Sequence, residues 1–166
     1  MAKRFFVSPL LVITVAALLL VAAPEGSGAQ ETTHDARYYN KLGLSYFNEA
    51  YYELTPKGRR QEAIQRYEQA IAAYKRAIAI DDAYVDGHRN LARVYYVQKR
   101  YSDAAQVYKR VTALNPSDID AYVKLASVYA QLQMYPEAIE QLEKAKSFTT
   151  DDIVLRQLDG FIEKLE

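Results

Sequence analysis

Apolar and small residues recur along this chain at a spacing of 34 residues. At this shift the segment 85–116 aligns with the segment that begins at Ile119. The superimposed pairs are Leu91 with Leu125, Ala92 with Ala126, Tyr95 with Tyr129, and Ala104 with Ala138. A repeat of this length is typical of stacked helical hairpins, because each repeat is one supersecondary unit.

Within each repeat the apolar residues lie three and four positions apart, which is the spacing of one helical face. In the segment 85–118 the inner faces of two helices are formed by His88, Leu91, Ala92 and Tyr95, then by Ala104, Tyr108 and Val111. Asn115 ends the second helix, because a residue before proline avoids the helical region. We therefore expect one hairpin over 85–118 and another over 119–152.

The region 36–84 has the features of a further hairpin. One face of its first helix carries Tyr39, Leu42, Gly43 and Tyr46. Gly43 occupies the slot of Ala126, where a small residue lets two helices approach closely despite the helix-propensity cost of glycine, about 1 kcal/mol. Pro56 and Gly58 end this helix, and a second helix follows in which Ala-Ile pairs recur every seven residues.

Measured against the 34-residue period, this first hairpin is 15 residues too long. The extra residues keep helical periodicity, which favours two lengthened helices over an inserted loop. Because 15 residues make about four helical turns, we expect the hairpin 36–84 to project past the rest of the stack.

Two local signals concern the end of the chain. Ser117 followed by Asp120 predicts a variant capping box before the third hairpin. The tail has an apolar side formed by Leu155, Leu158, Ile162 and Leu165. A helical array needs a closing element over its last apolar face, so we expect a capping helix over 153–166.

The N-terminus has a different pattern. Two basic residues precede an apolar run over 5–23, and the sequence PEGSGAQ follows. A basic start, an apolar middle and small residues before a cut are typical of an export signal. With cleavage after Ala29, this predicts a signal peptide over 1–29 and a short disordered linker over 30–35.

The alternative for this segment is an uncleaved membrane anchor. As a helix, the 19 residues 5–23 would span about 28 Å, close to the hydrocarbon thickness of a bilayer, roughly 30 Å. Under both interpretations the remaining chain crosses a membrane. We expect a periplasmic protein, or alternatively one anchored in the inner membrane and facing the periplasm.

Composition removes several functional classes. The chain has 21 basic and 21 acidic residues, so it lacks the basic excess that attracts nucleic acid, and we expect no nucleic-acid partner. The absence of cysteine rules out disulfides, thiol catalysis, cysteine-ligated metals and a lipid-modified N-terminal cysteine.

Candidate residues for catalysis or metal binding are few. His34 lies in the predicted linker, and His88 fills an aromatic packing slot. The aspartate pairs at 81–82 and 151–152 precede helices, where capping explains them. No sequence motif of a hydrolase, a metalloprotease or a phosphate-binding loop occurs. We therefore expect no enzyme activity, no catalytic residue, no metal site and no cofactor.

These repeats resemble the tetratricopeptide repeat family. Its motif asks for an aromatic residue, then Leu with Gly or Ala, then Tyr on the first helix, and for Ala, a large apolar residue and Ala on the second. The third repeat supplies Tyr122, Leu125, Ala126, Tyr129, Ala138, Leu142 and Ala145. The second departs from the motif at His88 and Val111. The prolines that end a repeat are replaced by Asp82 and Thr150 in the first and third repeats.

The resemblance implies an all-α fold, a right-handed superhelical array of three helical hairpins with a C-terminal capping helix. It also implies protein partners, bound as peptides or helices in a groove that the first helix of each hairpin lines. The groove-facing slots would be Asn40, Leu44 and Phe47, then Arg89, Arg93 and Tyr96, then Val123, Ser127 and Ala130.

Arg89 and Arg93 are four residues apart, so we expect their guanidinium groups to project together beside Tyr96. That arrangement suits an acidic side chain or a C-terminal carboxylate. The alternative is a solvated face on which Arg89 pairs with Asp86, three residues away.

Members of the family that bind chaperone tails need a Lys and an Asn on their first helix, where this chain has Asn40 and Leu44. That set is incomplete here. We expect a non-enzymatic adaptor or scaffold of a bacterial cell envelope that binds protein partners in its groove. The alternative is a structural subunit of an envelope assembly or secretion machine, attached to the membrane through 5–23. An enzyme or a metal-dependent protein is the least favoured interpretation. The pattern predicts no oligomeric state.

Overall fold

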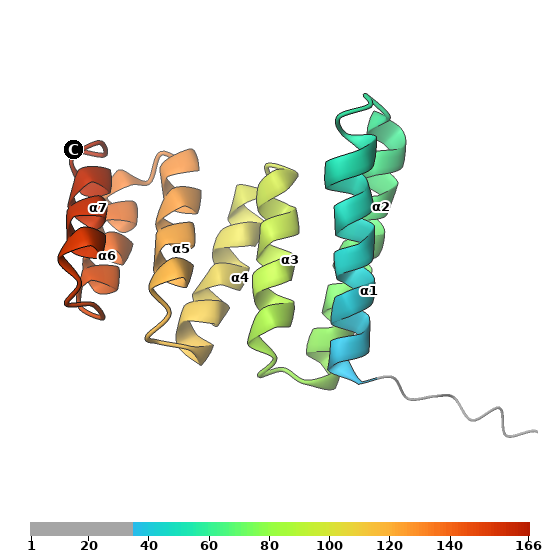
Figure 1. The fold of residues 1–166 in the computed structure, drawn as a ribbon, viewed down its shortest axis with the longest axis horizontal. Helices are drawn as coiled ribbons and strands as arrows, with labels where there is room; N and C mark the ends of the chain where they lie inside the picture. The colour runs from blue at the N-terminus through green and yellow to red at the C-terminus, as the bar shows by residue number, and fades with distance from the viewer. Residues whose placement is uncertain (1–34) are drawn as a thin grey trace, which may run out of the picture. The chain divides into compact units, whose positions relative to one another are not determined.

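The computed structural model describes residues 35–166, and every regular element in this range is helical. The elements are α1 (Ala36–Asn48), the π-helix η2 (Glu49–Leu54), α2 (Arg60–Ile80), α3 (Val85–Val97), α4 (Tyr101–Leu114), α5 (Ile119–Gln131), α6 (Tyr135–Lys146) and α7 (Asp152–Ile162). α1 packs on α2, α3 on α4 and α5 on α6, while α7 packs on α6 (Figure 1). This is an array of helical hairpins, as the sequence pattern predicts.

The predicted signal peptide or anchor over 1–29, and residues 30–34 of the predicted linker, lie outside the described residues. Asp35 is the N-cap of α1, and its Oδ1 accepts a 2.8 Å hydrogen bond from the Tyr38 N–H. Within the described residues, no helix combines the length and the hydropathy needed to cross a bilayer.

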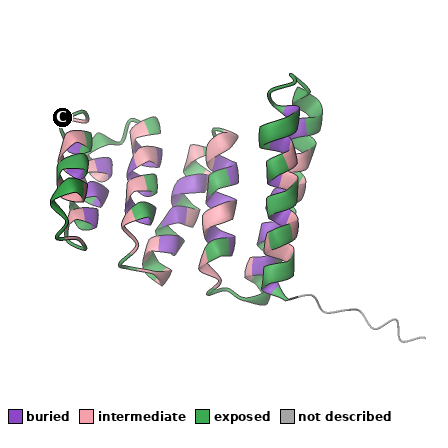
Figure 2. Ribbon diagram, viewed as in Figure 1, coloured by how far each residue is buried: buried purple, intermediate pink, exposed green. Residues whose placement is uncertain are grey.

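Alanines in the second helices are fully buried in the core. Ala70, Ala104 and Ala138 follow one another at the 34-residue spacing, and each has 0% of its surface exposed. Because their side chains end at Cβ, neighbouring helices can approach closely at these positions. Buried residues lie on the faces that adjacent helices share, and exposed residues lie on the outer faces (Figure 2).

Gly43 brings α1 against α2, as its slot predicts. A Cβ atom at Gly43 would lie 2.6 Å from Cε1 of Tyr74, and two further ring atoms would lie within 3.0 Å. Tyr74 is only 1% exposed, so its ring fills the space that a side chain at position 43 would need.

The first hairpin is longer than the others in the way that the periodicity predicts. The helical stretch 36–54 is six residues longer than α3, and α2 is seven residues longer than α4. The connection 55–59 adds two residues relative to 98–100, which completes the 15 extra residues. The tip of this hairpin projects past α3 and α4 (Figure 1).

One part of this hairpin differs from expectation. The sequence predicts one amphipathic α-helix through to Leu54, but η2 has the wider turn of a π-helix. At its end the Thr55 N–H donates to the Ala50 carbonyl, five residues earlier, at 3.0 Å. The Thr55 hydroxyl donates to the same carbonyl at 2.7 Å. Ala50 and Leu54 remain buried, so the wider turn keeps the apolar side of the helix on the core.

The cap of α5 also differs from the predicted capping box. Asp118, not Ser117, is the N-cap, and its Oδ1 accepts a 3.1 Å hydrogen bond from the Ala121 N–H. The Ser117 hydroxyl donates instead to Asn115 Oδ1 at 3.2 Å. A carboxylate is the better acceptor at a helix start, where the dipole favours negative charge.

The closing helix α7 covers the end of the third hairpin. Its Leu158 is 2% exposed, and Asp159 forms an ion pair with Lys146 of α6 at 2.7 Å. Asp151 caps the helix by accepting hydrogen bonds from the N–H groups of Ile153 and Val154 at 2.7 and 3.2 Å.

Candidate functional site

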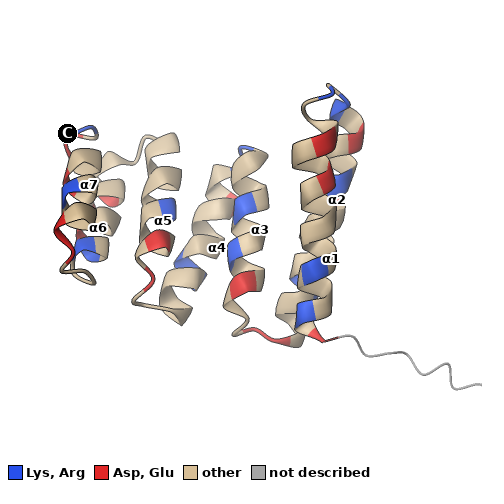
Figure 3. Cartoon of the chain, in the orientation of Figure 1, with Lys and Arg blue, Asp and Glu red and all other residues tan. Residues whose placement is uncertain are grey.

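A cleft of about 510 Å³ lies between α3 and α5, and we call it the α3–α5 cleft. Its walls come mainly from the first helices of the hairpins, with the end of the α1–η2 helix at one side. The lining residues are Tyr51, Arg89, Asn90, Arg93, Tyr96, Val97, Tyr108, Asp120, Lys124 and Ser127. Three of these side chains are basic and one is acidic, so the lining has a basic excess. Figure 3 colours the basic positions of α3 and α5 blue and the acidic positions red.

Arg93 offers the most hydrogen-bonding capacity to a ligand. Its guanidinium lies over the Phe47 ring, 4.6 Å from the ring centroid, and Phe47 is itself 1% exposed. Among residues 35–166 Arg93 has no hydrogen-bond or ion-pair partner, which leaves its N–H donors available in the cleft. The buried ring holds the planar group in place, which reduces the entropy lost when a ligand binds.

Arg89 lines the same cleft as Arg93 and Tyr96, but it is held by another partner than the expected Asp86. Its guanidinium forms an ion pair with Asp118 at 2.5 Å. The Asp118 side chain is only 9% exposed, whereas the Arg89 side chain is 38% exposed. Arg89 Nε is buried and has no hydrogen-bond partner among the described residues. Asp118 therefore joins the start of the third hairpin to the first helix of the second.

On the opposite wall, Lys124 lies 3.8 Å from Asp120, four residues earlier. Both side chains are more than half exposed, so water screens this pair and it contributes little to stability. Lys124 can therefore exchange this partner for a ligand carboxylate at small cost. The Tyr96 hydroxyl and Ser127 Oγ lie 3.4 Å apart and connect α3 with α5 across the cleft.

Tyr108 closes the cleft from the second layer of helices. Burial, together with the nearby Asp120 carboxylate, raises the pKa of Tyr108 to about 12, while Arg93 and Arg89 act in the opposite direction. The phenol therefore stays neutral at physiological pH and adds no negative charge to the basic cleft.

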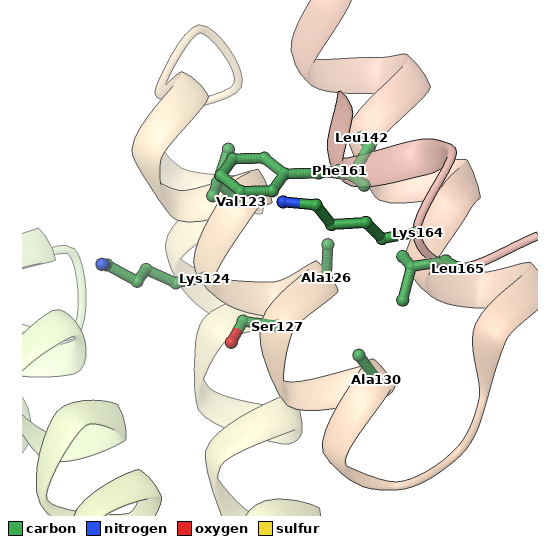
Figure 4. Close-up of a pocket in the computed structure, with 9 residues that line it drawn as sticks. All are labelled: Val123, Lys124, Ala126, Ser127, Ala130, Leu142, Phe161, Lys164 and Leu165. Carbon is green, nitrogen blue, oxygen red and sulfur yellow. The ribbon is translucent and has the colours of Figure 1, made fainter. Parts of the chain in front are cut away.

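A second cavity, of about 300 Å³, lies between α5 and α7, and we call it the α5–α7 pocket (Figure 4). Its lining is mostly apolar and comprises Val123, Lys124, Ala126, Ser127, Ala130, Leu142, Phe161, Lys164 and Leu165. Lys124 and Ser127 line both cavities, so the pocket adjoins the α3–α5 cleft.

The structure does not bring all the groove residues expected from the sequence to one surface. Arg89, Arg93, Tyr96 and Ser127 line the α3–α5 cleft, and Val123, Ser127 and Ala130 line the α5–α7 pocket. Leu44 is 38% exposed but lines neither cavity. Phe47 lies in the core beneath Arg93 and is not on the groove surface. Asn40 Oδ1 accepts a 2.9 Å hydrogen bond from Asn90 Nδ2, which joins α1 to α3.

Sequence reasoning missed several residues that line the cleft. Tyr51 stacks on Phe47 with ring centroids 5.5 Å apart, and the i, i+4 spacing of two aromatic residues was a usable signal. The spacing of Asp120 and Lys124 offered the same signal. Tyr108 gave none, because its slot is that of a core residue.

Of the two histidines, His34 lies outside the described residues, and His88 is buried. His88 is 7% exposed, and its Nε2 lies 2.9 Å from the carbonyl oxygen of Asp82, which is a packing role. Within residues 35–166 no three His, Asp or Glu side chains are grouped so that they could hold a metal ion.

Comparison with known families gives two matches. One tetratricopeptide repeat family model matches residues 55–119, and another matches residues 98–158. Together they span 55–158, more than half of the 166 residues. No curated protein sequence gives a match.

Several solved structures share the fold. TTC0263, a tetratricopeptide repeat protein of Thermus thermophilus, is 20% identical with a TM-score of 0.65, over 82% of this chain and 66% of that one. The type III secretion translocator chaperone SycD of Yersinia enterocolitica is 16% identical with a TM-score of 0.61. The match covers 86% of this chain and 96% of that one. The first tetratricopeptide domain of Spaghetti (RPAP3), bound to the HSP90 peptide SRMEEVD, is 19% identical with a TM-score of 0.55. The match covers 76% of this chain and 91% of that one. At these identities the likeness concerns the fold alone.

Proposed function

Because this chain belongs to the tetratricopeptide repeat family, we propose that it is a non-enzymatic adaptor that binds an acidic peptide segment of a protein partner in the α3–α5 cleft. The observation that carries this proposal is the Arg93 guanidinium, which is stacked on Phe47 and has unused donors. A neighbour of the same fold is seen with the acidic peptide SRMEEVD, which supports peptide binding as the mode of action.

The cleft suits a carboxylate for physical reasons. A planar guanidinium binds a carboxylate through two parallel hydrogen bonds, and such charge-assisted bonds are about twice as strong as neutral ones. Lys124 on the opposite wall adds a second positive charge with only a weak internal partner. Asp120 is the single acidic residue in the lining, so a ligand carboxylate meets little repulsion.

We predict that Arg93→Gln weakens binding of acidic peptides about tenfold or more, because a hydrogen bond to a charged group contributes roughly 1.5–3 kcal/mol. The measurement is selection from a pool of acetylated, amidated random peptides by the purified domain, followed by titration of the enriched peptides. The unaltered protein should enrich Asp and Glu.

Arg156→Gln is the matched control. It removes the same charge from α7. Among residues 35–166 the one partner of Arg156 Nε is the Asp152 carbonyl, and Arg156 lines neither cavity. An unaltered protein that does not enrich acidic residues, or an Arg93→Gln variant that binds them as well as Arg156→Gln does, would rule out the proposed function.

We also propose that the adaptor acts in a bacterial cell envelope, in the periplasm after removal of residues 1–29. The support is the basic start and the apolar run over 5–23. The alternative is an assembly subunit that keeps 5–23 as an inner-membrane anchor.

The two can be separated by expressing the full chain in a bacterium and sequencing the N-terminus of the purified protein. We expect the mature protein to begin at Gln30 and to leave the cell with the periplasmic fraction. A protein that begins at Met1 and stays with the membrane fraction would favour the anchored subunit, and one that begins at Met1 in the cytosol would refute export.

A further inference from the structure

We propose that the α5–α7 pocket binds a large apolar side chain of the same peptide whose acidic side chain lies in the α3–α5 cleft. This inference rests on the proposed function and adds a second specificity element to it. The partner would then carry an internal Asp or Glu with a Leu, Ile, Met or Phe close to it in sequence.

The two cavities are joined in a way that one peptide can use. Lys124 and Ser127 line both of them, so a ligand group bound beside Lys124 is one side chain away from the pocket. An extended peptide advances about 3.3 Å per residue. An apolar residue within about three positions of the acidic one can therefore reach the pocket.

The pocket itself has the chemistry of a side-chain site. Its volume of about 300 Å³ is larger than the ~150 Å³ that suffices to bind benzene in an apolar protein cavity. Figure 4 shows the Phe161 ring and Leu165 from the α7 side opposite Val123 and Ala130 of α5. Phe161 is 45% exposed, so a ligand would remove apolar surface from water.

The charges at the rim select the kind of ligand. Lys124 and Lys164 are the two charged residues in the lining, and no acidic residue lines the pocket. The Lys164 ammonium lies 5.8 Å from the Phe161 ring centroid and has no ion-pair partner among the described residues. An apolar side chain on an acidic peptide complements this rim, whereas a basic peptide does not.

The position of the basic groups indicates a side-chain carboxylate and not a chain terminus. Lys124 lines both cavities, whereas Tyr51 of the first hairpin lines only the α3–α5 cleft and Phe161 of α7 lines only the α5–α7 pocket. A peptide that continues on both sides of its carboxylate uses both ends, whereas a C-terminal carboxylate would leave one end empty. Asn40 and Asn90 are bonded to each other and do not offer a separate terminal site.

The test uses acetylated, amidated peptides with Glu fixed at the centre and random residues around it. The unaltered domain should enrich Leu, Ile, Met or Phe at one position within about three residues of the Glu. Ala130→Leu places a side chain in the pocket. It should abolish this preference and weaken binding of the best peptide about tenfold, the effect of losing one buried apolar side chain, while still preferring Glu over Gln.

The matched control is Ala113→Leu, the same substitution at an exposed α4 position outside both cavities, which should behave as the unaltered protein. If the unaltered protein does not prefer Glu-centred over Gln-centred peptides, the proposed function would be refuted. A retained Glu preference without any apolar preference, or an apolar preference that survives Ala130→Leu, would refute the pocket alone. Tighter binding of Gln-centred peptides with a free C-terminus would overturn the internal carboxylate.

Discussion

Replacing Tyr74 by Ala is expected to lower the free energy of unfolding by about 3–5 kcal/mol, the cost of truncating a large buried aromatic residue. The ring is 1% exposed and fills the space against Gly43 between α1 and α2. Urea denaturation of residues 30–166, followed by far-ultraviolet circular dichroism, measures the loss. The long first hairpin should lose the most stability, because both its helices meet at this ring.

Gly43→Ala, made with and without Tyr74→Ala, tests the contact between these two positions directly. In the unaltered protein the new Cβ would lie 2.6 Å from the Tyr74 ring, an overpacking that costs about 1–3 kcal/mol and outweighs the helix-propensity gain of about 1 kcal/mol. In the Tyr74→Ala background the ring is gone, so the same substitution should become stabilising. An equal effect of Gly43→Ala in both backgrounds would contradict the packing described here.

Asp118→Ala is expected to cost about 2–3 kcal/mol, because one carboxylate performs two tasks. It caps α5, which contributes about 1 kcal/mol, and it is the largely buried partner of Arg89. Breaking a fully buried pair costs about 3–5 kcal/mol, but Arg89 is more than a third exposed and can turn towards water, so the second contribution is smaller.

Two controls separate these tasks in the same denaturation experiment. Asp151→Ala removes the cap of α7. Because Asp151 has no ion-pair partner among the described residues, this substitution should cost only about 1 kcal/mol. Asp118→Asn keeps a good capping group and removes the charge, so its cost in unfolding free energy should lie between those of Asp151→Ala and Asp118→Ala. If Asp118→Ala costs no more than Asp151→Ala, the ion pair with Arg89 contributes nothing to stability.

The hairpins and the long first repeat could be predicted because helix packing leaves a direct imprint on sequence. A residue that faces a neighbouring helix must be apolar or small, and it recurs every three or four positions. Gly43 is the clearest case, since close approach to Tyr74 admits no side chain there. Thirteen of the 15 extra residues lie in helices that keep this periodicity, so their helical form was also predictable.

The π-turn of η2 was not predictable in the same way. Its buried positions, Ala50 and Leu54, are four residues apart, which an ordinary α-helix satisfies equally well. The choice between the two turns is made by hydrogen bonds at Thr55 and by packing on α2, and neither leaves a distinct apolar pattern.

The partners of long charged side chains were also not predictable from the sequence. Sequence spacing suggested Asp86 for Arg89, but stacking of the hairpins brings Asp118, 29 residues away, within 2.5 Å. Likewise, slot spacing predicts that Phe47 faces the groove, while in the folded chain Arg93 of the next hairpin lies over its ring. Such contacts depend on how successive hairpins are set against each other, which a pattern within one helix does not contain.

The attachment of α7 has a consequence for how binding and stability are linked. Among the described helices α7 packs mainly on α6, so it should open by local unfolding at a lower free energy than helices packed on two neighbours. α7 supplies Phe161 to the α5–α7 pocket, and the residues that follow this helix supply Lys164 and Leu165. A ligand in this pocket would therefore bind only molecules in which α7 is docked. By mass action the ligand raises the opening free energy of that helix by RT ln(1 + [L]/Kd). Binding should therefore slow amide hydrogen exchange in α7.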